Sequence, residues 1–167
     1  MSPRAAAVNE AMRSRSRARI MQATVDLVDE RGFDRTTLGD IAERAGLARG
    51  LVSYYFPGKR YLLQSSTHRL MHQTLGAALA ALTDDDPAEL WLATSIDAVL
   101  GLAAARPTLM RTHLSLILAP SAEGFIQDEE QQRFGGLLRR LVDATASPSN
   151  WFASHASHRG YCLRRRA

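Results

Sequence analysis

The strongest indication of a function lies in residues 36–59, with the sequence TTLGDIAERAGLARGLVSYYFPGK. Two short helices joined through Ala45-Gly46-Leu47 would form a compact corner here, with Gly46 supplying the positive φ of the turn. Such a corner holds its second helix, residues 48–55, out from the body of the protein. A helix held in this way can enter a DNA major groove, which is about 12 Å wide. The segment therefore predicts nucleic-acid binding.

Other groups of residues give weaker signals for chemistry. His68 and His72 have a helical spacing that can bind a transition metal, but no Cys, Asp or Glu stands at a matching position. His155, His158 and Cys162 form a second loose group. The sequence contains neither a glycine-rich phosphate loop nor a nucleophile elbow. We therefore predict no catalytic residue, no metal and no cofactor, and a protein that is not an enzyme.

The predicted corner needs a supporting helix, which we expect to precede it in the sequence. Apolar residues recur at helical spacing from about residue 16, at Ile20, Ala23, Leu27 and Val28. Gly32 is positioned to end this first helix. Thr37 is a predicted N-cap of the next helix, and Asp40 three residues later completes a capping box.

The rest of the chain also has the pattern of helices. We expect a long helix at 59–82, then helices at 87–105, 107–119 and 121–146, with Asp86 capping the helix that begins at Pro87. The helix at 87–105 is apolar around most of its circumference, so we expect it to be central. The predicted fold class is all-α. Its predicted parts are a flexible basic arm at 1–13, a helix-turn-helix domain at 14–60, a helical effector-binding and dimerisation domain at 61–146, and an irregular basic tail at 147–167.

Composition narrows the class of protein. Hydrophobic residues make up 46 % of the 167 residues, which is enough for a packed core. We find no run of about 20 uninterrupted apolar residues, and no apolar run behind Arg4 that would suggest a secretory signal. The single cysteine agrees with a reducing compartment. We expect a cytoplasmic protein with no membrane partner.

Charge is distributed unevenly along the chain. Residues 1–60 hold eleven Arg and Lys against seven Asp and Glu, whereas residues 61–158 hold six against ten. The last nine residues add four arginines. A basic first third before an acidic body suggests that contact with a polyanion belongs to the N-terminal part.

A set of spaced residues between about 16 and 63 resembles the tetracycline-repressor (TetR) family of regulators. These residues are Gly32-Phe33, Thr36-Thr37, Ile41-Ala42, Ala45-Gly46-Leu47, Gly50, Tyr55-Phe56, Lys59, Leu62 and Leu63. The resemblance implies an all-helical homodimer with an N-terminal DNA-reading domain, and a C-terminal domain that binds a small molecule and thereby changes the spacing of the two readers. It also implies a sequence-specific regulator, in most members a repressor, on a pseudo-palindromic operator in double-stranded DNA.

The resemblance also assigns candidate DNA-binding residues. Arg49 begins the recognition helix, where an arginine can bond to guanine O6 and N7, or else contact phosphate alone. Tyr54 and Tyr55 correspond to positions that contact the DNA backbone, although Tyr55 could belong mostly to the core. Lys59 stands where the family places a lysine, at a helix start that favours phosphate. Thr37 could use its hydroxyl on phosphate, but capping is its better-supported role.

This chain departs from the family pattern at several sites. Ala48 replaces the usual capping Ser, which costs the recognition helix about 1 kcal/mol. Ser53 replaces a phosphate-binding Tyr, and Leu51 is apolar at a base-facing position, where it could meet a thymine methyl. Gly39 weakens the second helix by roughly 0.5–1 kcal/mol. Arg13, Arg15, Arg17 and Arg19 could reach phosphates or a minor groove from an extended lead, or simply lie in solvent.

Three side chains are candidates for lining an effector cavity, or else belong to the ordinary core: Trp91, Met110 and His113. Members of the family usually finish with two helices that pack against the partner subunit, where this chain has WFASHASHRGYCLRRRA. We expect a dimer through residues 107–146, or else poor dimerisation. The alternative function is a nonspecific nucleic-acid binder that lacks those helices.

Overall fold

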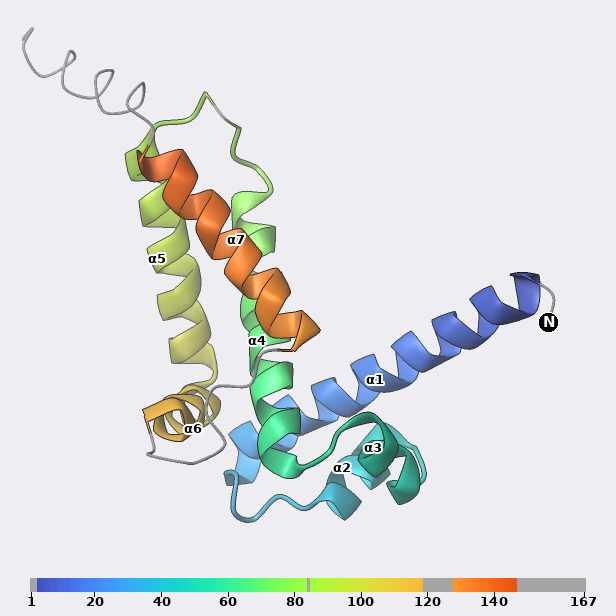
Figure 1. Cartoon of the computed structure of the whole chain (residues 1–167). Helices are drawn as coiled ribbons and strands as arrows, with labels where there is room; N and C mark the ends of the chain where they lie inside the picture. The colour runs from blue at the N-terminus through green and yellow to red at the C-terminus, as the bar shows by residue number, and fades with distance from the viewer. Residues whose placement is uncertain (1–2, 84, 119–127, 147–167) are drawn as a thin grey trace, which may run out of the picture.

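The computed structural model describes residues 3–83, 85–118 and 128–146 (Figure 1). Within these ranges the chain forms seven helices and no strand, which confirms the predicted all-α class. The helices are α1 (Pro3–Arg31), α2 (Leu38–Ala45), α3 (Arg49–Tyr55), α4 (Lys59–Leu79), α5 (Ala88–Ala105), α6 (Pro107–Leu118) and α7 (Glu129–Ala146).

The helices form two packed groups that share α4. The short helices α2 and α3 pack together beside the C-terminal half of α1, and the first turns of α4 complete this group (Figure 1). From there α4 runs away from α2 and α3 to pack with α5 and α7, while α6 lies near the end of α1. The fold thus places α2 and α3 at one end of the molecule and the α4–α5–α7 bundle at the other.

The core beneath the two short helices is continuous and apolar. Ile20 of α1, Ile41 of α2, Val52 of α3 and the adjacent Phe56 are all fully buried in one cluster. Burial of such side chains contributes about 1.5–3 kcal/mol each, so this cluster is the main force holding the two short helices against α1. Val52 and Phe56 thus supply the inward side of α3 and of the residue that follows it.

The first helix begins much earlier than expected. α1 starts at Pro3 rather than near residue 16, so residues 3–13 are helical instead of an irregular arm. Figure 1 shows this part of α1 projecting away from the other helices. Residues 6–13 are exposed, and the segment holds four alanines and two arginines, which are strong helix formers. Propagation from the packed part of the helix then needs no new nucleation, so the helix continues without tertiary contacts.

Helix ends in the second half differ in detail from the prediction. α4 ends at Leu79, and α5 has Pro87 rather than Asp86 at its N-cap. The Asp86 carboxylate instead accepts hydrogen bonds from the Thr83 N–H at 2.7 Å and the Thr83 hydroxyl at 3.0 Å, which stabilises the preceding turn. The described part of the last predicted helix is α7. The expected start of that helix at Ser121 lies outside the described residues. The same holds for the tail at 147–167, which contains His155, His158 and Cys162.

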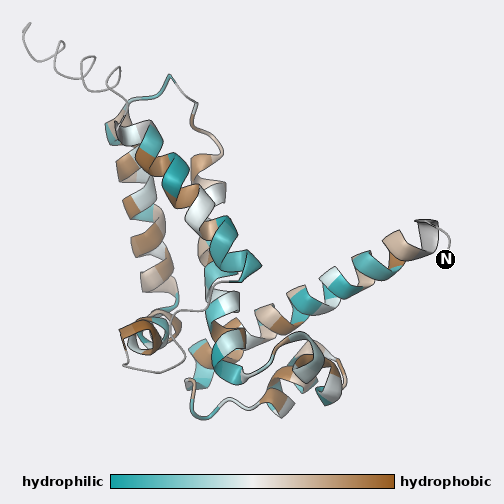
Figure 2. Cartoon of the chain, viewed as in Figure 1, coloured by the Kyte–Doolittle hydropathy of each residue, from teal (hydrophilic) through white to brown (hydrophobic). Residues whose placement is uncertain are grey.

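The prediction that α5 is central is wrong. Only one of its sides packs on α4 and α7, and Leu92, Ile96, Val99 and Leu100 are 41–61 % exposed. Figure 2 shows hydrophobic residues along much of this helix. Among the described residues, α5 is also the one helix long and apolar enough to cross a membrane by length and composition, a test that core helices pass as well. The sequence pattern correctly indicated that α5 is apolar around most of its circumference. The described residues of one copy of the chain cover only part of that apolar surface.

Candidate DNA-binding site

The start of α2 is fixed by a reciprocal pair of hydrogen bonds. The Thr37 hydroxyl accepts from the Asp40 N–H at 3.1 Å, and the Asp40 carboxylate accepts from the Thr37 N–H at 2.9 Å. Hydrogen bonds from the Thr37 backbone and hydroxyl hold the pKa of the Asp40 carboxyl below its usual value. This is the predicted capping box, and it satisfies backbone donors that the first turn leaves free. The Thr37 side chain is therefore already bound within the protein.

The corner between α2 and α3 has the predicted conformation. Gly46 adopts φ +62°, and its N–H and that of Leu47 donate to the carbonyls of Glu43 and Ala42, both at 2.9 Å. The Arg19 guanidinium from α1 donates to the Gly46 carbonyl at 3.4 Å. The positive φ favours glycine at this position. A Cβ on residue 46 would also lie 2.7 Å from Arg19 Nη2, so the end of the Arg19 side chain would have to shift.

The helix α3 is short and exposes one whole side. Its inner side carries the buried Val52, while Arg49, Ser53 and Tyr54 are exposed and Leu51 is half-buried. Tyr54 is 69 % exposed, and its ring meets the edge of the Tyr55 ring at 5.2 Å between centroids. The Ala48 N-cap makes no side-chain hydrogen bond, so the first turn keeps free N–H groups. The predicted contact residues of this helix thus share an accessible surface, with the exception of Tyr55.

Two of the predicted residues also serve the core. Tyr55 is half-buried and packs against the cluster around Phe56. The Lys59 ammonium donates to the Phe33 carbonyl at 2.8 Å and lies 4.1 Å from the centroid of the Phe33 ring. Lys59 therefore ties the start of α4 to the connection between α1 and α2. Its contact with phosphate remains a prediction.

The arginines of α1 do not form an extended lead. Because they lie on a helix, Arg13 and Arg17 share one side and Arg15 and Arg19 the other. The Arg17 guanidinium lies 4.9 Å from the centroid of the Phe56 ring, and Arg19 binds the corner at Gly46. These two arginines brace α1 against the α2–α3 pair, a role that alternation in the sequence did not reveal.

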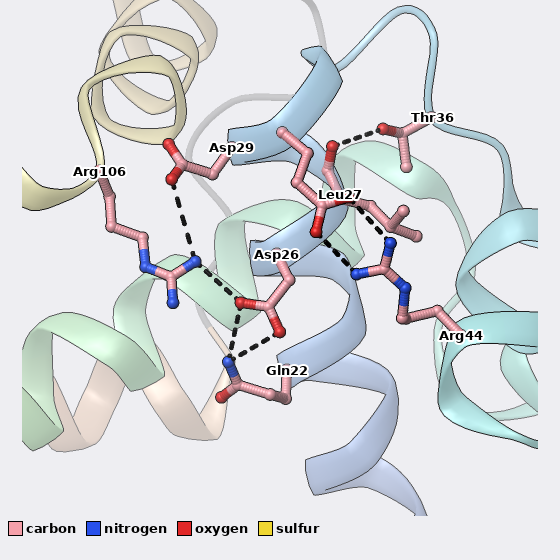
Figure 3. Close-up of polar contacts among 8 residues, drawn as sticks. Gln22, Asp26, Leu27, Asp29, Thr36, Arg44 and Arg106 are labelled. Atoms are coloured by element: carbon pink, nitrogen blue, oxygen red, sulfur yellow. Dashed lines mark hydrogen bonds and ion pairs between the residues drawn. The ribbon is translucent and has the colours of Figure 1, made fainter.

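Ion pairs hold the outer side of α2 against α1. Arg44 donates two hydrogen bonds of 2.8 Å to the two carboxylate oxygens of Glu30, and Arg31 lies 2.7 Å from Asp40 (Arg44 is drawn in Figure 3). The hydrogen bonds from Arg44 lower the pKa of the Glu30 carboxyl. Because both partners are exposed, the pairs fix geometry more than they stabilise the fold.

A second set of polar contacts connects α1 to the bundle. Arg106, between α5 and α6, lies 2.8 Å from the Asp26 carboxylate and 4.0 Å from that of Asp29 (Figure 3). The Asp29 carboxylate also accepts from the Leu109 N–H at 3.2 Å, and Arg60 donates to the Leu116 carbonyl. These partners are 56 to 80 residues apart in sequence, so local patterns could not have predicted them.

The three candidates for an effector cavity do not come together. Trp91 lines a cavity of about 610 Å³ between α4, α5 and α7. Met110 of α6 lines a separate small pocket together with residues of α4, α5 and α7. His113 is buried against His68 of α4, with 5.3 Å between ring centroids. His72 lies at the Trp91 cavity rather than beside His68 in a metal site, and the described residues contain no group of three metal-binding side chains.

The short helix α3 follows a tight glycine corner, packs on the neighbouring helices, and exposes basic and tyrosyl side chains. This arrangement defines a helix-turn-helix DNA-binding domain. Residues 20–65 match the family described as bacterial regulatory proteins, tetR family. Over these residues the chain is similar to the TetR family.

Individual proteins are similar to parts of the chain, which spans less than half the length of the curated relatives that it matches. The chain is 39 % identical over 64 residues to the HTH-type transcriptional regulator BetI 1 of Chromohalobacter salexigens, a match that covers 38 % of this chain and 31 % of the relative. The fold is similar to that of a TetR family regulator from Marinobacter aquaeolei VT8, with TM-score 0.59, 24 % identity, and coverage of 81 % of this chain and 69 % of that one. It is also similar to FadR from Bacillus subtilis, solved in complex with stearoyl-CoA, with TM-score 0.53, 22 % identity, and coverage of 75 % and 64 %.

Proposed function

We propose that the protein is a sequence-specific, DNA-binding regulator of transcription that reads DNA with α3. The observation that carries this proposal is the exposed side of α3, where Arg49, Ser53 and Tyr54 stand together on a helix whose other side is locked into the core. Arg49 offers a bidentate donor for guanine, and Tyr54 offers a hydroxyl for phosphate. The excess of basic residues in the first third of the chain favours approach to the DNA from this end.

The regulator is proposed to act as a homodimer. Two copies would place their α3 helices in successive major grooves about 34–36 Å apart, on a pseudo-palindromic operator. The exposed apolar side of α5, with Leu92, Ile96, Val99 and Leu100, supports an association of two copies, since isolated domains rarely leave so large an apolar surface in water. As a DNA-binding regulator without enzymatic activity, the protein would work in the cytoplasm.

A small molecule is proposed to control DNA binding, with repression as the resting state. FadR of Bacillus subtilis, whose fold this chain shares, was solved with stearoyl-CoA bound. In this chain the cavity beside Trp91 has a volume of about 610 Å³, which is suited to a small ligand. A ligand there would change DNA affinity only as far as it prefers one arrangement of the readers over another.

Fluorescence anisotropy with labelled DNA tests the proposal. DNA from the region upstream of the reading frame should bind, and an excess of unrelated competitor DNA should leave most of that complex intact. Complete loss of the complex to competitor would instead establish the nonspecific binder. Light scattering on the same sample should give the mass of two chains, and a monomer at micromolar concentration would contradict the dimer.

A further inference from the structure

The cavity beside Trp91 combines an apolar wall with a polar rim. It lies between the last turns of α4, the first turns of α5 and the second half of α7, at the end of the molecule remote from α3 (Figure 1). Its lining consists of His72, Gly76, Leu79, Ala80, Trp91, Leu137, Arg140, Leu141 and Asp143. A volume of about 610 Å³ is within the range of pockets that hold small organic ligands.

The inner wall of the cavity is firmly packed. Leu79 and Leu137 are 5 % and 7 % exposed and belong to one buried cluster, against which Trp91 packs. Gly76 opens space here, because a Cβ at this position would meet only the Leu137 side chain, at 3.9 Å. This wall offers an alkyl chain or ring system a preformed apolar surface.

The rim supplies one distinctive charged group. Arg140 lines the cavity, and among the described residues it forms neither an ion pair nor a hydrogen bond, whereas Arg133 on the same helix pairs with Glu129 and Glu130. An arginine remains charged at any working pH and can hold a carboxylate with two parallel hydrogen bonds. The Asp143 carboxylate at the same rim would repel a second negative charge on a ligand. The rim therefore suits a ligand with a single anionic group.

We propose that this cavity binds an amphipathic monocarboxylate, with its apolar body on Trp91 and Leu137 and its carboxylate on Arg140. The inference deepens the effector part of the proposed function and rests on it for its regulatory meaning. Ligand binding itself is measured without DNA.

Trp91 fluorescence provides the readout. Trp151 is changed to Phe, which leaves Trp91 as the single tryptophan of the full chain. The probes are decanoate, decanol and decyltrimethylammonium, each below its micelle concentration. Decanoate should give a saturable change in Trp91 emission and bind at least tenfold more tightly than decanol, while the cation should bind more weakly than either.

Matched variants locate the binding site. Arg140→Gln should reduce decanoate affinity to that of decanol, whereas Arg139→Gln, on the adjacent residue outside the cavity lining, should keep the preference. Gly76→Leu should fill the cavity and abolish binding of both probes, with circular dichroism showing an intact helical fold. Equal affinities for decanoate and decanol, or a preference that survives Arg140→Gln, would overturn the inference.

Anisotropy with DNA on the same preparations separates the two proposals. If decanoate shows its Arg140-dependent preference while no specific DNA binding is found, the cavity inference stands and the proposed function fails. If specific DNA binding is found and the decanoate preference is absent, the cavity inference alone is wrong.

Discussion

At the residue scale, the buried and exposed positions of α3 explain how so short a helix can be held in place while it presents the side chains proposed to read DNA. Seven residues are too few to be stable alone, and Ala48 provides no side-chain cap. Val52 and the adjacent Phe56 are fully buried, so tertiary packing holds the helix in place. The exposed Arg49 and Tyr54 are therefore not needed to hold the helix in the fold. Substitutions at these two positions should change DNA binding without unfolding the protein.

Arg49→Ala tests whether this arginine reads a base. We expect a loss of about 1–3 kcal/mol of discrimination at one base pair in each half-site, since a bidentate contact to guanine would be removed. The measurement is a competition assay with operators that differ at single positions. Tyr54→Phe is the companion variant and should weaken binding to all operators alike, because a phosphate contact carries no sequence information. A uniform loss for Arg49→Ala as well would mean that Arg49 holds only phosphate.

Gly46→Ala tests the corner. Alanine at φ +62° costs about 1–2 kcal/mol, and its Cβ would also displace Arg19. The free energy of unfolding, measured by urea titration, should fall by at least this amount. Gly50→Ala is the control: a Cβ there has nothing within 4 Å, and alanine in a helix is favoured over glycine by roughly 0.5–1 kcal/mol. Similar effects of the two variants on stability would be inconsistent with a strained corner.

The residues that sequence reasoning assigned correctly are those whose role is local. Thr37 with Asp40, and Gly46 with its neighbours, act within a few positions, so their types and spacing were sufficient. Lys59 shows the opposite case. Its ammonium binds the carbonyl of Phe33, 26 residues away, which no spacing rule could predict. The cavity was likewise only partly predicted, since Trp91 and Arg140 come to line it through the packing of α5 and α7.

At the scale of elements, the contact between α4 and α6 contains an unusual buried pair. His68 and His113 are 2 % and 3 % exposed, and their rings meet edge to face. Burial, and then the neighbouring His68, lowers the pKa of His113 to about 4. Burial also lowers the pKa of His68, while the Asp128 carboxylate near α7 acts in the opposite direction. Both rings are therefore expected to be neutral in the folded protein at neutral pH.

This pair makes stability depend on pH. The unfolded chain binds protons on His113 near pH 6.5, but the folded chain does so only near pH 4, so acid favours unfolding between these values. We expect the free energy of unfolding to fall by about 2 kcal/mol from pH 6.5 to 4.5 through this residue. Urea titrations across this range measure the slope. His113→Leu should flatten it and His72→Gln should not; an unchanged slope in His113→Leu would falsify the assignment.

The two helices that departed from expectation, α1 and α5, did so for related reasons. Periodicity in the sequence indicates which side of a helix is apolar. It does not indicate where the first part of α1 begins or what covers the apolar sides of α5. The first part of α1 is exposed and is helical through propensity and continuity. α5 is apolar nearly all round, yet the described chain packs only one side of it. An apolar surface does not specify whether the same chain or another copy covers it.

At the scale of the whole molecule, the acidic residues Asp26 and Asp29 of α1 connect the reading domain to the bundle through Arg106. The exposed apolar side of α5 lies in that bundle, apart from α3, so association through the bundle would leave both readers free. Ile96→Glu tests this arrangement. Because a charge in an apolar interface is costly, the variant should be monomeric in light scattering at concentrations where the parent is dimeric. Asp97→Lys on the same helix, outside the Leu92–Ile96–Val99–Leu100 group, should remain dimeric, whereas a dimeric Ile96→Glu would place the interface elsewhere.

Selection from random double-stranded DNA tests whether paired copies of α3 read DNA sequence. The full chain should enrich an inverted repeat whose half-sites are separated by about one helical turn, roughly 34–36 Å. Arg49→Ala, selected in parallel, should lose preference at one position in each half. Enrichment of no motif by the unaltered chain, despite measurable DNA binding, would contradict the account.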